Sequence, residues 1–258
     1  MKRFFSFLIC LSFLALSTPL LCSAAEMSPL SAECAVLYDP SGGRVLYGKN
    51  ADKRHAMAST TKIMTALVAL GHLPLDTVVT VPKEATGVEG SSVYLKPGET
   101  YTLEALLYAL LLQSANDAAE AIAYAVAGGV EPFATLMNEA AEELGLSDTH
   151  FENPHGLDGE AHYTTARELA VIAAKALENE DFAKIVSTRR YIFAATNGEN
   201  PRTLINHNKM LVIAFSVYML KYTTFPSDIE AVSLNLMVIL VHCAVKSAFN
   251  ASPVCVSS

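Results

Sequence analysis

A serine and a lysine lie one helical turn apart in the stretch HAMASTTKIMTALVAL, residues 55–70. Side chains three positions apart share one face of a helix, so Ser59 and Lys62 would be neighbours. A serine hydroxyl becomes a good nucleophile when a base takes its proton. A lysine can be that base if burial lowers its pKa, and the apolar residues 63–70 would bury it. Backbone N–H groups at the helix start could also stabilise an oxyanion.

The spacing of Ser59 and Lys62 is a weak signal by itself. At ordinary residue frequencies, a chain of this length would contain about one S-x-x-K by chance, and this chain contains one. The alternative is an N-cap serine followed by a solvated lysine. These residues alone leave both interpretations open.

A second polar group, Ser114-Ala115-Asn116, lies at a break between two helical patterns. In an extended link, a hydroxyl and a carboxamide two positions apart point to the same side. They could pass a proton and hold a substrate amide. The alternative is that Asn116 or Asp117 caps the following helix.

The elements that would position these residues suggest an α+β fold. Two β-rich runs, 34–38 and 44–48, flank the turn DPSGG and predict a hairpin. Further strands are expected at 77–81, within 93–101 and at 191–196. Strands before and after a block of helices favour an antiparallel sheet packed by helices.

Helix-boundary signals divide the middle of the chain. The first helix, 59–70, should end at Gly71, and a second, nearly all apolar, should begin at Leu103. A third should start with a capping box of Asp117 and Glu120 and end at Gly128. A helix from Pro132 to Gly145 follows, and a box of Thr165 and Glu168 starts the last clear helix.

Composition and the N-terminus limit the classes of function. A net charge of −8 and a pI of about 5.4 argue against a nucleic-acid partner. A basic start, an apolar run and small residues before Ala25 predict a signal peptide over residues 1–25, hence an exported protein of the cell envelope or medium. A retained anchor and a lipoprotein attached through Cys22 are the alternatives.

The spacing of cysteine and histidine does not suggest a metal site. Removal of the signal peptide would leave Cys34, Cys243 and Cys255, an odd number that cannot form a complete disulfide framework. His155 and His162 are isolated in the sequence and no H-E-x-x-H occurs. We expect both to be loop histidines that form hydrogen bonds, and we expect no metal or other cofactor.

Taken together, the motifs resemble a known family. S-x-x-K followed by S-x-N is the pattern of penicillin-binding proteins and β-lactamases. The chain resembles the serine-type D-alanyl-D-alanine carboxypeptidases, which are low-molecular-mass penicillin-binding proteins, over about residues 30–210. The stretches that carry the resemblance are AVLYDPSGGRVLYGKNAD, STTK, LLQSANDAAEAIA, THFENPHGLDGEAHYTTARELA and NHNKML.

The resemblance implies a β-lactamase/transpeptidase-like α+β fold and a role for each motif residue. Ser59 would attack the carbonyl between the two terminal D-alanines of a peptidoglycan stem peptide, with Lys62 as base. Ser114 would relay a proton to the departing D-alanine, and Asn116 would orient the substrate amide. β-Lactams would acylate the same serine. The loops FENPHGLD and HYTTA would provide structural support.

The family's third motif, K-T-G, is absent. No K-[ST]-G occurs in the chain, and the nearest string is Lys246-Ser247-Ala248. The last 49 residues, 210–258, contain four charged side chains and no glycine. We expect a carboxypeptidase domain over 26–209 that is incomplete at its C-terminal end, followed by an unmatched apolar tail. Divergence, an anchor and a change of reading frame are alternative origins of the tail, and we favour the frame change.

Two rival functions follow from these observations. The absent third motif suggests a catalytically impaired protein that only binds stem peptides. A β-lactamase would need a carboxylate that activates the deacylating water. Glu142, Glu143 and Glu152 are present, but none has a sequence context like that class's loop.

Overall fold

The computed structural model describes residues 30, 32–157, 159–198 and 201–208. The predicted signal peptide, 1–25, and the predicted tail, 210–258, lie outside these residues. The chain divides into two units, Met1–Ser31 and Ala32–Ser258, and every described helix and strand belongs to the second. In the described part, no helix is long and apolar enough to cross a bilayer.

All strand pairing in the described residues is antiparallel, as predicted. β1 (Ala35–Asp39) pairs with β2 (Arg44–Lys49) around the expected turn, with an irregularity between Leu37 and Tyr38. The other two pairs join β3 (Val78–Thr80) to β4 (Thr100–Thr102) and β5 (Arg190–Phe193) to β6 (Arg202–Ile205). Within the described ranges these form three separate two-stranded ladders rather than one sheet.

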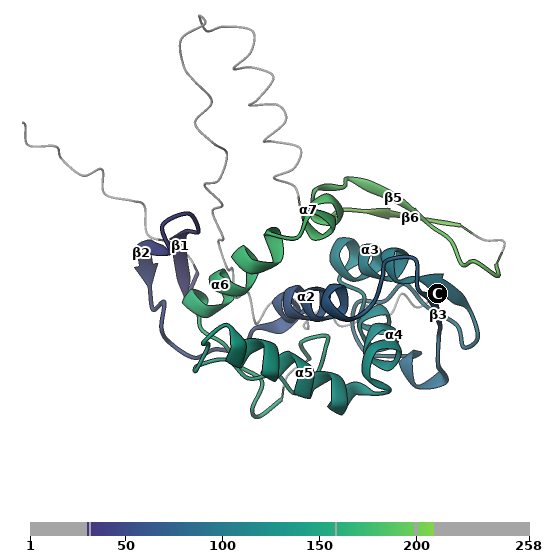
Figure 1. Cartoon of the computed structure of the whole chain (residues 1–258), viewed down its shortest axis with the longest axis horizontal. Coiled ribbons are helices and arrows are strands. Elements are labelled where there is room, and N and C mark those ends of the chain that lie inside the picture. Colours follow the sequence, from purple (N-terminus) through teal and green to yellow (C-terminus); the bar gives the residue numbers. More distant parts are fainter. Residues whose placement is uncertain (1–29, 31, 158, 199–200, 209–258) are drawn as a thin grey trace, which may run out of the picture. The chain divides into compact units, whose positions relative to one another are not determined.

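The helices form the centre of the second unit. α2 (Lys62–His72) contacts α3 (Leu103–Gln113), α4 (Asn116–Ala127), α5 (Val130–Glu143) and α6 (Ala166–Leu177), and it lies between α3 and α5 in Figure 1. α3 is buried nearly all round, as its sequence predicts. Its largest fully buried side chains are Leu103, Leu106, Leu107, Leu110 and Leu112. Each contributes about 1.5–3 kcal/mol through burial.

The helix end predicted at Gly128 is confirmed, whereas the end predicted at Gly71 is wrong, because α2 continues through Gly71 to His72. One predicted cap is also corrected. Gly128 ends α4 with a φ of 79°, and the Thr165 side chain accepts a hydrogen bond from the N–H of Glu168 at the start of α6. The capping box of Asp117 and Glu120 is wrong. α4 begins at Asn116 without a side-chain cap. The Asp117 carboxylate instead accepts hydrogen bonds from the preceding loop, because Ser92 Oγ and the N–H groups of Val93 and Leu95 point to it.

One helix, α7 (Glu180–Ser187), was not predicted from the sequence. It is short and polar at its start, although Asn179 caps it by accepting from the N–H of Phe182. α7 leads into the β5–β6 hairpin, which stacks its aromatic side chains on the rest of the unit. The Tyr108 and Tyr191 rings lie 3.8 Å apart, and the Tyr101 and Phe193 rings 4.5 Å.

The second strand of the β3–β4 pair also lies away from its expected place. The stretch 93–101 was expected to contribute a strand and then a turn, whereas β4 follows the turn at Thr100–Thr102. The reason is that the N–H groups of Val93 and Leu95 are bound by the Asp117 carboxylate and so are not available to a strand partner.

Candidate active site

Ser59 lies in a 3₁₀ turn, Ala58–Thr61, that leads directly into α2. The predicted helix therefore begins as a tighter turn. Ala58 has a φ of 46°, a left-handed conformation that costs a non-glycine residue about 1–2 kcal/mol. The next residue, Ser59, is exposed. The strained turn thus presents the hydroxyl at the surface of the described unit.

Lys62 is buried, with 2% of its surface exposed. Its Nζ donates to Ser59 Oγ at 3.2 Å and to the carbonyl oxygen of His155 at 2.6 Å. Burial lowers the pKa of Lys62 from its ordinary 10.5 to about 7. The alternative of a solvated lysine is therefore wrong, and the amine has the burial and the neighbour that a base for Ser59 requires.

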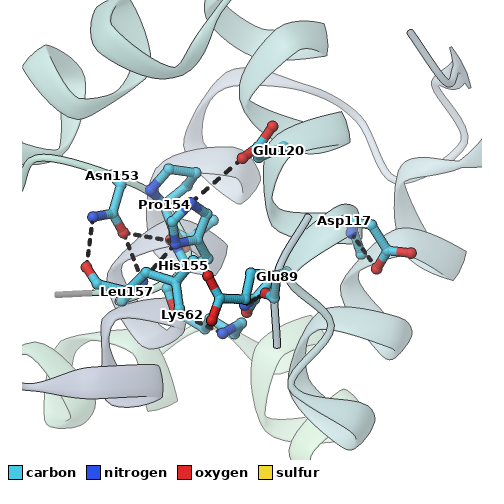
Figure 2. Close-up of polar contacts among 12 residues, drawn as sticks. Lys62, Glu89, Asp117, Glu120, Asn153, Pro154, His155 and Leu157 are labelled. Carbon is cyan, nitrogen blue, oxygen red and sulfur yellow. Dashed lines mark hydrogen bonds and ion pairs between the residues drawn. The ribbon is translucent and has the colours of Figure 1, made fainter. Parts of the chain in front are cut away.

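The loop Asn153–Leu157 forms the wall against which Lys62 rests (Figure 2). The Asn153 side chain accepts from the N–H groups of His155 and Gly156, at 3.3 and 2.7 Å, and donates to the carbonyl of Leu157 at 2.9 Å. One turn beyond Lys62, Thr65 Oγ1 donates to the carbonyl of Pro154 at 2.6 Å. The loop is thus shaped by the Asn153 side chain and is held to α2 by two hydrogen bonds, from Lys62 and Thr65.

The Ser114–Asn116 segment joins α3 to α4. The segment was expected to be extended, but Ser114 is left-handed, with φ and ψ of 56° and 35°. Asn116 is the first residue of α4 and makes no side-chain cap, so the capping alternative is wrong. Its Nδ2 donates to the carbonyl of Glu89 at 2.6 Å, and its backbone N–H donates to Ser91 at 2.7 Å.

Two buried oxygens of this segment have no hydrogen-bond partner among the described residues. They are Ser114 Oγ and Asn116 Oδ1. A buried polar atom without a partner costs about 1–3 kcal/mol, and such atoms cluster where a ligand or water completes the bonding. The segment therefore offers one hydroxyl and one carboxamide oxygen to a bound molecule.

The two loop histidines are hydrogen-bonded, as predicted. His155 Nδ1 accepts from the N–H of Leu157 at 3.2 Å, and His155 Nε2 lies 3.4 Å from Glu120 Oε1 (Figure 2). His162 Nε2 lies 2.7 Å from Thr61 Oγ1. Among the described residues, no group of three His, Cys, Asp or Glu side chains is arranged to hold a metal ion.

Sequence analysis missed the backbone groups of the site. The carbonyls of His155 and Glu89 each receive a hydrogen bond from a motif residue, Lys62 or Asn116. A carbonyl has no sequence signature. The only signal was the turn-forming stretch ENPHGLD, which indicates a loop and not what the loop contacts.

Comparison with known proteins assigns the family. The model of the D-alanyl-D-alanine carboxypeptidase family, peptidase family S11, matches residues 22–222. The chain belongs to this family. Among solved structures, the D-alanyl-D-alanine carboxypeptidase of Mycobacterium tuberculosis H37Rv aligns with a TM-score of 0.69 and 35% identity, over 74% of this chain and 72% of that one. This likeness, together with that to the Streptomyces K15 DD-transpeptidase described below, confirms the β-lactamase/transpeptidase-like α+β fold.

Two further relatives are informative. The DD-transpeptidase of Streptomyces K15 aligns with a TM-score of 0.67 and 36% identity, over 71% of this chain and 76% of that one. The D-alanyl-D-alanine carboxypeptidase DacF of Bacillus subtilis is 36% identical over 185 residues, which cover 70% of this chain and 47% of DacF. The chain thus spans about half the length of that curated relative.

Proposed function

We propose that the chain is a serine-type D-Ala-D-Ala carboxypeptidase that works through an acyl-enzyme on Ser59. The single observation that carries the proposal is the state of Lys62: a buried amine with a pKa of about 7, 3.2 Å from the Ser59 hydroxyl. At neutral pH a large fraction of this amine is unprotonated and can take the serine proton. Family membership supports a substrate class of peptides that end in D-alanyl-D-alanine.

The proposed reaction assigns one step to each of the four motif residues. Ser59 Oγ attacks the carbonyl between the two D-alanines while its proton passes to Lys62. Ser114 relays a proton to the amine of the terminal D-alanine, which leaves as the C–N bond breaks. Asn116, whose Oδ1 has no partner in the described residues, accepts from a substrate amide. Water then hydrolyses the ester and restores Ser59.

The proposed function places the protein in the cell envelope. The predicted signal peptide would export the chain, and its substrate, the peptidoglycan stem peptide, lies outside the membrane. β-Lactams would acylate Ser59 as analogues of the D-alanyl-D-alanine end. Neither reaction calls on a metal or an organic cofactor, because a serine and its base supply the nucleophile.

A second candidate is a protein that binds stem peptides without cleaving them efficiently. The absence of K-T-G from the sequence supports this alternative. In the family that motif binds the substrate carboxylate, and its strand supplies an oxyanion donor. Loss of one such donor costs about 100- to 1000-fold in rate. The β-lactamase alternative has less support, because none of Glu142, Glu143 and Glu152 has a sequence context like that class's loop.

Intact-mass measurement after exposure to benzylpenicillin tests the proposal. The parent chain should gain the mass of one penicillin, and Ser59→Ala should gain none. Ser41→Ala, in the exposed turn between β1 and β2, is the matched control and should react like the parent. Release of D-alanine from a peptide ending in D-alanyl-D-alanine then separates the two candidates. A folded parent chain that forms no adduct would refute the catalytic assignment.

A further inference from the structure

We propose that His162 is a positioning residue for the nucleophile, acting through Thr61 on the turn that carries Ser59. The inference rests on the proposed function, in which Ser59 is the nucleophile. His162 is 101 positions from Thr61 in sequence, yet its ring Nε2 lies 2.7 Å from Thr61 Oγ1. Thr61 directly precedes Lys62 and closes the 3₁₀ turn Ala58–Thr61.

The hydrogen bonds around His162 have one consistent direction. The backbone N–H of Glu152 donates to Nδ1 of His162 at 3.0 Å, so Nδ1 of the neutral ring carries no proton. The ring proton is therefore on Nε2 and is donated to Thr61 Oγ1. Thr61 uses its single hydroxyl proton to donate to the carbonyl of Ala58 at 2.8 Å. The result is a chain from Glu152 through His162 and Thr61 to Ala58.

This chain is buried and held on both sides. His162 is 3% exposed and Thr61 is 0% exposed, so water does not compete for their hydrogen bonds. The edge of the His162 ring meets Phe151, with ring centres 5.8 Å apart and planes at 77°, which fixes the ring's orientation. A buried, oriented donor of this kind specifies one position for the group it binds.

The end of the chain is the strained residue beside the nucleophile. Ala58 is left-handed, with a φ of 46°, and a residue other than glycine keeps this conformation only when its surroundings enforce it. The bond from Thr61 to the Ala58 carbonyl is one such restraint, and His162 fixes the Thr61 hydroxyl that makes it. Relaxation of Ala58 would rotate the next residue, Ser59, away from Lys62.

The test compares two replacements of similar volume at position 162. His162→Met fills the site without a donor, and His162→Gln keeps an N–H for Thr61. We expect His162→Met to slow acylation by benzylpenicillin about 10- to 100-fold, the effect of losing a buried hydrogen bond. His162→Gln should recover most of the parental rate. His150→Gln is the control, because the His150 ring bonds to the carbonyl of Ala161 and not to the turn.

A double-mutant cycle tests the route through Thr61. Thr61→Val removes the hydroxyl at nearly constant volume and should slow acylation as His162→Met does. If His162 acts through that hydroxyl, the double variant should be no slower than Thr61→Val alone. Additive losses in the double variant would overturn the proposal, as would a parental rate in His162→Met.

A second readout does not depend on catalysis. The NMR shifts of the Ala58 backbone report its left-handed conformation directly. They should move in His162→Met and stay at parental values in His162→Gln. If the parent chain is not acylated, the proposed function fails, and these shifts alone decide the inference. Unchanged Ala58 shifts in His162→Met would overturn it.

Discussion

Gly156 lies directly against the carbonyl oxygen of Ala58. Its φ is 89°, and a Cβ built on it would overlap that oxygen and come within 2.8 Å of Thr61 Oγ1. The loop that supports Lys62 can thus approach the nucleophile turn only because residue 156 has no side chain. The backbones of two segments nearly one hundred positions apart in the sequence are therefore in direct contact.

Gly156→Ala should therefore damage the site. We expect a loss of stability of more than about 2 kcal/mol, because overlap with a backbone atom adds to the strain at positive φ. The acylation rate should fall as well, since relief of the overlap moves Ala58 or His155. The matched control is Gly98→Ala, where φ is 83° but no heavy atom lies within 4 Å of the added Cβ.

Gly98→Ala should show only the cost of the left-handed conformation, about 1–2 kcal/mol. Urea denaturation and penicillin acylation of the two variants measure the difference. Equal effects of the two substitutions would contradict the close approach of Gly156 to Ala58.

The rate of acylation should follow the protonation of Lys62. Its pKa of about 7 means that the reactive, neutral amine is about half of the total at pH 7 and about one tenth at pH 6. We expect the second-order rate with benzylpenicillin to rise about tenfold per pH unit below 7 and to level above it. A rate that keeps rising to pH 10 would show that Lys62 has its ordinary pKa.

The same burial makes Lys62 a source of instability. The pKa of a free lysine is 10.5 and that of Lys62 is about 7, so between these values the unfolded chain binds more protons. Stability should rise with pH across this window, and the full penalty, about 5 kcal/mol, applies below pH 7. Lys62→Met should therefore stabilise the fold below pH 7, less a contribution from the unpaired His155 carbonyl, and this gain should shrink toward pH 10.5.

Urea denaturation of Lys62→Met at pH 6 and pH 9.5 measures the change in that gain. Lys175→Met, a substitution on the exposed surface of α6, serves as control and should show no such pH dependence. A stability difference between Lys62→Met and the parent that is constant with pH would contradict the lowered pKa.

Asn116→Ala should impair both the loop before α3 and the reaction. The Glu89 carbonyl would lose its donor, which costs about 1 kcal/mol of stability. The substrate would lose the free Oδ1, so we expect acylation to fall about 10- to 100-fold. Asn197→Ala removes two side-chain hydrogen bonds, to Thr100 and Gly98, and should leave acylation unchanged. Equal acylation by the two variants would argue against a role for Asn116 in binding.

Much of the fold could be predicted because its signals are local. The hairpin of β1 and β2 was marked by its turn residues, α3 by its apolar run, and the end of α4 by Gly128. The error at Asp117 has a tertiary cause. Its carboxylate is a good cap by residue type, but it accepts hydrogen bonds from the N–H groups of Val93 and Leu95, more than twenty positions earlier in the chain. Propensity cannot rank a local partner against a distant one.

The sequence predicted which side chains form the candidate site but not the contacts that surround them. Spacing placed Ser59 beside Lys62, and the structure has their polar atoms 3.2 Å apart. The carbonyl that orients Lys62 comes from a loop more than ninety residues later, and the burial that lowers its pKa arises only in the folded unit. No periodicity connects these segments, so a sequence pattern cannot supply the environment on which the chemistry depends.

The wide separation of Lys62 from the loop at 153–157 also has a consequence for the order of events during synthesis. α2 is complete long before the loop has been made, and until the loop docks Lys62 is solvated and protonated. Under the proposed function, Ser59 has no base in that interval, so the growing chain would be inert toward peptides and β-lactams alike. Under that function, reactivity would appear only after the loop has docked on α2, which ties the onset of catalysis to a contact between distant segments.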